Sequence, residues 1–433
     1  QESFDGRFPN VRYQTPNPEV RDAMADVIEF AKSNQADLAM ATDPDADRIG
    51  MAAPTGDGEW YFFNGNEIAV LLTNYCLKAK QKAGTLPEAP LVVKTEVTTE
   101  LISKITTTFG GQCVGNLLVG FKYIGNALHM WESQQNFDGV PGTLDQFILG
   151  VEESHGALVT HQIRDKDAAG AAIHLADYAY ALKQEGKTLY HALMEIYRKF
   201  GYYCNRLTSM IMEGATGLVR IKNMIASLRT APPETLGGFK VLNFFDHQNE
   251  QGRFGAIKSE TDRSSRNVMV FHLENDMRII LRPSGTEPKA KLYMEIPTPP
   301  ADHETLLANI KESDQKVIKL TRDLTVDFLA RIGIELPAYA LQISDLVSID
   351  NKILFVEKIL PEWSQKVREA LAEGPLTDAQ RQSISGWLQG SLKKVSTQPR
   401  GLLAEGFASY VETLSGESED FVKALQDTFN ALP

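Results

Sequence analysis

Short apolar runs alternate with segments of helical periodicity between residues 38 and 200. Leu38–Ala41 is the first apolar run, and PLVVK, GQCVGNLLVG and QFILGV follow it. Between and after these runs, apolar residues recur every three or four positions, most clearly in Glu67–Lys80 and Ala171–Lys199. This alternation predicts α/β domains with parallel sheets, because a helix returns the chain to the edge where the next parallel strand begins.

The pattern changes near residue 201. Residues 268–297 read as strands joined in hairpins, and a helix is predicted from His303 to about Leu320. We interpret this part of the chain as an α+β unit.

The tail from about residue 330 reads as four or five amphipathic helices. Apolar residues between Val356 and Val367 keep a helical period, and Thr377 with Gln380 forms a capping-box pattern. The tail carries no chemistry-bearing cluster, and we interpret it as a packing or assembly element.

Composition sets limits on the partners of the chain. Its 433 residues allow several domains, since one hydrophobic core seldom grows past roughly 250 residues. The formal net charge of -12 argues against nucleic acid as a partner. Three widely spaced cysteines predict neither disulfides nor structural zinc and favour a cytoplasmic location. No apolar run is long enough to predict a membrane span.

Three aspartates alternate directly after the first predicted strand, at Asp43, Asp45 and Asp47. Carboxylates this close repel one another, and a divalent cation removes the repulsion. Few, hard oxygen ligands favour Mg²⁺, and Arg48 offers a planar fork for a phosphate oxygen. A solvated acidic turn and a phosphatase-type aspartyl nucleophile are the alternatives. A calcium loop is excluded, because its twelfth position would be Pro54.

A second motif, LRPSGTEPKAKLY, lies between two predicted strands. Hydroxyls, cations and a glycine that permits close approach are what a phosphate dianion needs. A turn with a few surface cations is the alternative. The residues of interest are Arg282, Ser284, Gly285, Thr286, Lys289 and Lys291.

Two further loops follow predicted strands. GVEESHG places Glu152, Ser154 and His155 where they could bind sugar hydroxyls or transfer protons. RDKDAAG contains Lys166, which could act as an acid or base if burial or neighbouring cations lowered its pKa. Charged surface turns are the alternative in both places.

The order DPDADR, GFKYIGN, EESHG, RPSGTEPK, between about residues 8 and 325, resembles the α-D-phosphohexomutase superfamily. The resemblance implies mixed-sheet, three-layer α/β domains followed by an α+β domain, with the helical C-terminal extension outside the family core. The implied domains are a metal-binding remainder over 1–82, a sugar-binding domain over 83–200, a phosphate-binding domain over 201–328 and the extension over 329–433.

The resemblance also implies roles for individual residues. It makes the three aspartates the Mg²⁺ ligands, and it names Lys166, Arg48 and His155 as catalytic candidates. Arg48 would contact a phosphoserine. The implied sugar- and phosphate-binding residues are Gly120, Glu152, Ser154, Arg282, Ser284, Gly285, Thr286 and Lys291.

The implied activity is interconversion of a hexose 1-phosphate and a hexose 6-phosphate, with glucose favoured. A phosphoserine and a hexose 1,6-bisphosphate intermediate would carry the phosphoryl group. The partner would be a small sugar phosphate rather than a nucleic acid or a membrane.

The sequence departs from the family in two places. Its only Ser-His pair is Ser154–His155, so no serine loop of the T-A-S-H-N-P type is present, and Lys291 stands where many relatives have arginine. We therefore expect that the serine domain is missing and that the chain alone is inactive. A Mg²⁺-dependent sugar-phosphate phosphatase and a non-catalytic sugar-phosphate binder stay open as alternatives.

Overall fold

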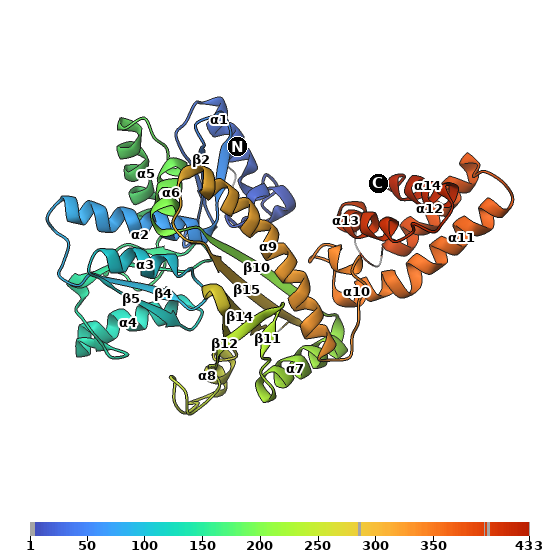
Figure 1. Cartoon of the computed structure of the whole chain (residues 1–433). Helices are drawn as coiled ribbons and strands as arrows, with labels where there is room; N and C mark the ends of the chain where they lie inside the picture. Colours follow the sequence, from blue (N-terminus) through green and yellow to red (C-terminus); the bar gives the residue numbers. More distant parts are fainter. Residues whose placement is uncertain (1–4, 285–286, 394, 396–398, 433) are drawn as a thin grey trace. The chain divides into compact units, whose positions relative to one another are not determined.

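The computed structural model describes residues 5–284, 287–393, 395 and 399–432. Two compact units are present. One comprises the residues up to Asn205 together with Glu295–Ser313, and the other comprises Arg206–Met294 and the residues from Asp314 onward. Figure 1 shows the elements of both units. None of the described helices is long and apolar enough to cross a membrane.

The first sheet frames the aspartate loop. Its strands, in spatial order, are β1 (Ala39–Thr42), β2 (Ile49–Pro54) and β3 (Trp60–Phe63). Both pairings are antiparallel, and Ala41 lies opposite Gly50. The mixed sheets implied by the resemblance include this antiparallel one, because the connections 43–48 and 55–59 are too short for a parallel crossover, which needs about a dozen residues. The strands β2 and β3 were not predicted from the sequence.

A small core supports this sheet from one side. Met24, Ile28 and Ala31 pack against Ala39 and Ala52 of the first two strands. The helical residues of this core come from η2 (Arg21–Met24) and α1 (Ala25–Ser33), and a further short helix, η1 (Arg12–Gln14), precedes them.

The second sheet confirms the predicted α/β layers. The strands are β4 (Leu91–Thr95), β5 (Gln112–Leu117), β8 (Phe147–Val151) and β9 (Ala157–Leu158), in the spatial order β5-β4-β8-β9. The central strand β4 is parallel to both neighbours. Alternate residues of β4 enter different cores, Val92 on one face and Leu91 with Val93 on the other, so the sheet is buried on both sides.

Helices cover both faces of this sheet (Figure 1). The core containing Val92 draws on α2 (Gly65–Lys82), α3 (Leu101–Thr108), α5 (Ala168–Gln184) and α6 (Leu189–Phe200). The opposite core draws on α4 (Phe121–Gln134). Short elements complete this region: β6 (Asn136–Phe137), β7 (Val140–Pro141) and η3 (Leu144–Gln146).

The single helix predicted over Ala171–Lys199 is in fact two helices. The chain turns at Gly186, whose φ of 70° suits a residue without a Cβ. Thr188 then begins α6 with a capping box completed by His191. The periodicity of the two helices nearly coincides, which explains why the sequence reads as one.

The predicted α+β fold is built on a six-stranded sheet in the order β10-β15-β14-β13-β12-β11, and most of its residues belong to the second unit. These strands are β10 (Tyr203–Ile211), β11 (Thr235–Leu236), β12 (Phe239–Asp246), β13 (Met269–Leu273), β14 (Arg278–Pro283) and β15 (Lys289–Pro297). The associated helices are α7 (Gly214–Thr230), α8 (Glu260–Ser265), η4 (Glu274–Asp276) and α9 (His303–Ala330). Helix α9 runs beyond the predicted end near Leu320, because Leu324 and Phe328 continue its buried stripe.

The tail forms a helical extension, as predicted. Its elements are η5 (Ala340–Gln342), α10 (Ile349–Leu354), the π-helical turn η6 (Phe355–Ile359), α11 (Leu360–Ala372), α12 (Asp378–Leu392), α13 (Pro399–Glu412) and α14 (Glu419–Asn430). Trp363, Phe407 and Phe429 stack at its centre. The capping box of Thr377 and Gln380 is confirmed.

Candidate functional site

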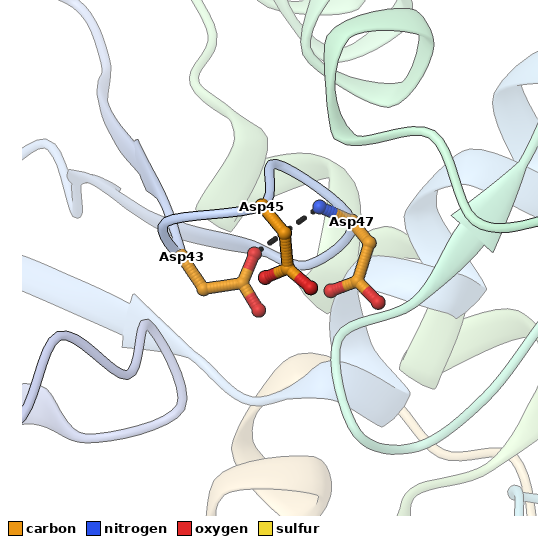
Figure 2. Close-up of side chains that lie close together, drawn as sticks. All are labelled: Asp43, Asp45 and Asp47. Atoms are coloured by element: carbon orange, nitrogen blue, oxygen red, sulfur yellow. Dashed lines mark hydrogen bonds between the residues drawn. The ribbon is translucent and has the colours of Figure 1, made fainter.

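The three aspartates come together in the loop between β1 and β2. One carboxylate oxygen from each lies within 4.8 Å of the others. Figure 2 shows the three side chains on one side of the loop. Asp43 Oδ1 accepts the backbone N–H groups of Asp47 and Arg48, both at 3.1 Å, and Ala46 has a φ of 57°. Asp43, which is one of the three clustered aspartates, therefore also closes the loop through its hydrogen bonds.

Two cations contact the aspartates directly. Arg48 Nε donates to Asp43 Oδ2 at 2.7 Å, and Lys166 Nζ lies 2.7 Å from Asp47 Oδ2. Arg48 also donates to Glu19 through Nη1 at 2.8 Å. Among the described residues, the buried Asp47 Oδ1 has no hydrogen-bond partner. Clustered hard oxygen ligands, one of them a buried oxygen that accepts no hydrogen bond from a described residue and lies 3.5 Å from Arg48 Nε, fit a Mg²⁺ ion.

The surroundings shift the pKa values of Asp43, which is buried, and Asp47, which is half-buried, in opposite directions. Burial favours a higher pKa for Asp43, but the hydrogen bonds from Arg48 outweigh it and lower the pKa. Burial raises the pKa of Asp47, and the neighbouring Asp43 carboxylate adds to this effect while Lys166 opposes it. The raised pKa of Asp47 is thus due first to burial, and the Asp43 carboxylate makes a smaller contribution.

The predicted sugar-binding loop, Glu152–Gly156, called the sugar loop below, follows β8 and is bonded to the start of β2. His155 Nδ1 lies 2.9 Å from the carbonyl oxygen of Ile49, whose N–H donates back to the His155 carbonyl at 3.1 Å. A β-bridge also joins Arg48 to Gly156. His155 is buried, with a φ of 66°. These contacts fit a residue that positions two loops, and the catalytic role of His155 stays a prediction.

Glu152 is the first residue of this loop, and its side chain holds the start of α4. Its Oε1 accepts the N–H of Gly120 at 3.1 Å, and burial raises the pKa of Glu152. Gly120 has a φ of 129°, which favours glycine, and immediately precedes α4. Ser154 is half-buried. The structure thus brings these predicted sugar-binding residues to one group of loops.

Lys166 passes over Gly156 to reach the aspartate loop. A Cβ at Gly156 would lie 2.4 Å from Lys166 Cδ, so the glycine makes room for the lysine. Burial favours a lower pKa for Lys166, but Asp47 and Glu152 outweigh it and raise the pKa. The environment therefore does not support a lysine with a lowered pKa, the condition that the sequence interpretation attached to acid–base catalysis.

Sequence reasoning missed Lys94, which is fully buried at the end of β4. Its Nζ donates to the carbonyl oxygens of Thr98 and Gly115, at 3.0 and 3.2 Å, and to Glu100 Oε1 at 2.8 Å. Thr98 Oγ1 in turn accepts the N–H of Glu153 in the sugar loop at 3.1 Å. The signal in the sequence that could have identified Lys94 is its place as the charged last residue of the apolar run PLVVK.

The predicted phosphate loop lies in the second unit, between β14 and β15. Arg282 and Ser284 are half-buried near the end of β14, and Lys291 is half-buried on β15. Ser284 Oγ accepts the N–H of Glu287 at 3.2 Å. Gly285 and Thr286, which complete the predicted site, lie outside the described residues. Lys289 pairs with Glu287.

Three domain models of one family match the chain in order. They are phosphoglucomutase/phosphomannomutase alpha/beta/alpha domain II over residues 1–56, alpha/beta/alpha domain III over residues 64–200 and the C-terminal domain over residues 246–313. The helical extension lies outside all three.

Individual relatives agree with the domain matches. The chain is 36% identical over 318 residues to a Haemophilus influenzae protein named "Probable phosphomannomutase", covering 73% of this chain and 57% of the relative. It is 33% identical over 294 residues to the phosphoglucomutase of Staphylococcus haemolyticus, covering 68% of this chain and 50% of that protein. The chain thus spans about half the length of the curated relatives it matches.

Solved structures are also similar to the chain. The structure of parafusin, a phosphoglucomutase from Paramecium, is 17% identical, with a TM-score of 0.47 and coverage of 75% of this chain and 51% of that one. Taken with the aspartate loop, the sugar loop and the three consecutive domain matches, the sequence relatives establish that the chain belongs to the α-D-phosphohexomutase superfamily.

Proposed function

We propose that this chain supplies the metal- and sugar-phosphate-binding part of a phosphohexomutase. The proposal depends on one observation: carboxylate oxygens of Asp43, Asp45 and Asp47 lie within 4.8 Å of one another, with Arg48 and Lys166 on the same loop cluster. Acidic ligands beside two cations are the groups needed to hold Mg²⁺ next to a phosphate ester.

In the proposed reaction, the P–O bond to a phosphoserine breaks as a bond to a sugar hydroxyl oxygen forms. The three aspartates would hold Mg²⁺, which supplies positive charge to the phosphoryl group when bound. Arg48 would contact the transferring phosphoryl group. Lys166, charged beside Asp47, would donate a proton to the departing serine oxygen and recover one from the attacking sugar hydroxyl. The resulting hexose 1,6-bisphosphate would return its other phosphoryl group to the serine.

The remaining predicted residues would bind the sugar phosphate. Glu152, Ser154 and the Gly120 turn would contact sugar hydroxyls, and Arg282, Ser284 and Lys291 with the loop 285–286 would bind the phosphate that is not transferred. We propose glucose 1-phosphate and glucose 6-phosphate as substrates. No serine loop of the family type occurs in the 433 residues. We therefore propose that turnover needs a phosphoserine segment beyond them.

The geometry disfavours the phosphatase alternative. Both oxygens of Asp43 are engaged, Oδ1 by two backbone N–H groups and Oδ2 by Arg48. An aspartyl nucleophile needs an oxygen free to attack phosphorus. The contacts of Asp43 instead fit a residue that shapes the loop and binds a cation.

Calorimetric titration of the 433-residue chain with glucose 1,6-bisphosphate tests the proposal. Binding should be measurable with Mg²⁺, should weaken with EDTA, and should weaken in the Glu152→Gln variant. Equal binding with Mg²⁺ and EDTA, or none in either, would contradict it. A coupled assay for glucose 1-phosphate conversion tests the second claim, since turnover at the rate of an intact phosphoglucomutase would refute the need for an added phosphoserine.

A further inference from the structure

A polar cavity of about 410 Å³ lies within the second unit, outside the proposed mutase site. It lies where α9 and β10 meet the segment around η5 and the start of α13. The polar groups that matter are Arg206, Arg322, Gln342, Ser344, Asp345 and Glu405. The family matches end at residue 313, so most of this lining lies beyond them.

Two guanidinium groups face this cavity with their hydrogen-bonding capacity largely unused. Arg206 Nε is buried and has no hydrogen-bond partner among the described residues. Arg206 Nη2 lies 3.9 Å from Asp345 Oδ2, and Arg322 Nη2 lies 3.8 Å from Glu405 Oε2. Both distances exceed those of charge-assisted hydrogen bonds. Each arginine is therefore near an acid but not bonded to it.

One neighbouring carboxylate has another partner, and the other is exposed to water. Asp345 Oδ2 accepts a hydrogen bond from Thr208 Oγ1 at 2.6 Å. The Glu405 side chain is 78% exposed, so water competes for it. A third cation, the buried Lys352, lies nearby and donates to the carbonyl oxygen of Ile343 at 2.8 Å. Cations thus outnumber carboxylates here, in a chain whose formal net charge is -12.

Neutral donors complete the lining. Ser344 Oγ accepts the N–H of Leu346 at 3.3 Å, which leaves its own hydrogen for a ligand. Gln342 is fixed by its bond to Ser409 Oγ at 2.7 Å. Donors on separate elements, two of them guanidinium groups, suit a tetrahedral dianion that accepts bonds from several directions. The volume exceeds what inorganic phosphate fills and falls in the range of small-ligand sites.

We propose that this cavity binds a phosphate monoester through Arg206 and Arg322, at the junction of the phosphate-binding domain and the helical extension. The phosphoryl oxygens accept hydrogen bonds from the two guanidinium groups, and the esterified group occupies the rest of the cavity. This proposal does not rest on the proposed mutase function, because it uses none of the residues assigned to it.

Because the cavity lies at the junction of the α+β domain and the helical extension, a bound phosphate ester should affect how firmly the extension is attached. Arg206 and Arg322 belong to β10 and α9, whereas Ser344 and Asp345 belong to the extension. A ligand bonded to both sides stabilises their junction by mass action. Phosphate esters should therefore protect the segment 331–348 from proteolysis.

The test uses the 433-residue chain carrying Arg282→Gln, so that the predicted phosphate loop contributes little. Inorganic phosphate and glucose 6-phosphate are titrated calorimetrically at constant ionic strength. Arg206→Gln and Arg322→Gln should each weaken binding by about tenfold or more, since each removes charge-assisted hydrogen bonds. The matched control is Arg381→Gln, because Arg381 on α12 is also only loosely paired, at 3.5 and 4.0 Å from aspartates.

Two results would overturn the proposal. One is loss of all binding in the Arg282→Gln background, which assigns the phosphate to the predicted loop. The other is equal affinity of the Arg206, Arg322 and Arg381 variants, which indicates nonspecific charge. Circular dichroism shows whether each variant is folded. If Arg206→Gln is unfolded, the comparison is made with Arg322→Gln alone.

Discussion

At the scale of single residues, the surroundings of Asp45 and Asp43 in the aspartate loop differ. Asp45 is exposed and Asp43 is buried with three hydrogen bonds. Asp45→Asn should weaken Mg²⁺ binding by at least about tenfold, or about 1.4 kcal/mol, without loss of stability. Asp43→Asn should weaken Mg²⁺ binding and also cost about 1–3 kcal/mol of unfolding free energy, because an amide NH₂ faces Arg48 Nε or the backbone N–H groups. Calorimetry with Mg²⁺ and urea unfolding measure the two effects. Equal stability losses in both variants would show that Asp43 does not shape the loop.

His155 supplies a prediction about pH. Burial lowers the pKa of His155, so the unfolded chain binds more protons than the folded chain below about pH 6.5. Neutral His155 contributes fully to the stability of the fold above about pH 6.5. This contribution is lost as the pH falls toward the lower pKa that His155 has in the folded chain. His155→Asn suits the φ of 66° and does not titrate. Between pH 7 and pH 5, the urea midpoint of the wild-type chain should fall more than that of the variant. Parallel falls would exclude His155 as the source.

At the scale of elements, sequence patterns located the strands β1, β4, β5 and β8 and the hairpin strands of 268–297, but they missed β2, β3, β10 and β12 and did not give the strand partners. The alternating aspartates and the turn between β14 and β15 could be read directly, because charge and turn residues are local signals. The antiparallel first sheet and the break at Gly186 depend on loop length and backbone angle, which periodicity does not encode. The contact from Lys94 through Thr98 to Glu153 joins residues 59 positions apart in sequence, from 94 to 153, and only the fold brings them together.

Lys94 is the residue through which β4 supports the sugar loop. Lys94→Met should cost about 2–4 kcal/mol of unfolding free energy, because it leaves the carbonyls of Thr98 and Gly115 without their donor. It should also speed hydrogen exchange in residues 150–156. Lys82→Met is the control, since Lys82 is exposed at the end of α2. Unchanged exchange in the sugar loop, with stability lost, would limit Lys94 to a structural role in β4.

At the scale of the second unit, the helical extension has a core of its own and a polar attachment to the α+β domain. The core centres on Trp363, while the attachment pairs Glu213 and Arg220 with the start of α10. The sequence predicted the helices from their apolar period. It could not predict the attachment, because isolated charged residues on two surfaces carry no pattern until they are paired.

Asp350 is the centre of that attachment, since its Oδ1 accepts from Arg220 Nη1 at 2.8 Å and its Oδ2 accepts the N–H of Glu213 at 2.6 Å. Asp350→Asn removes the charge and places an NH₂ group against one of these donors. The junction should therefore open more often, and a protease should cut the segment 331–348 several-fold faster, because cleavage follows the population of the open form. The extension itself should keep its helical circular dichroism, since its aromatic core is untouched. Asp378→Asn serves as the control because its side chain is 96% exposed on α12. Identical cleavage rates for the two variants would show that apolar contacts, rather than this ion pair, hold the extension to the domain.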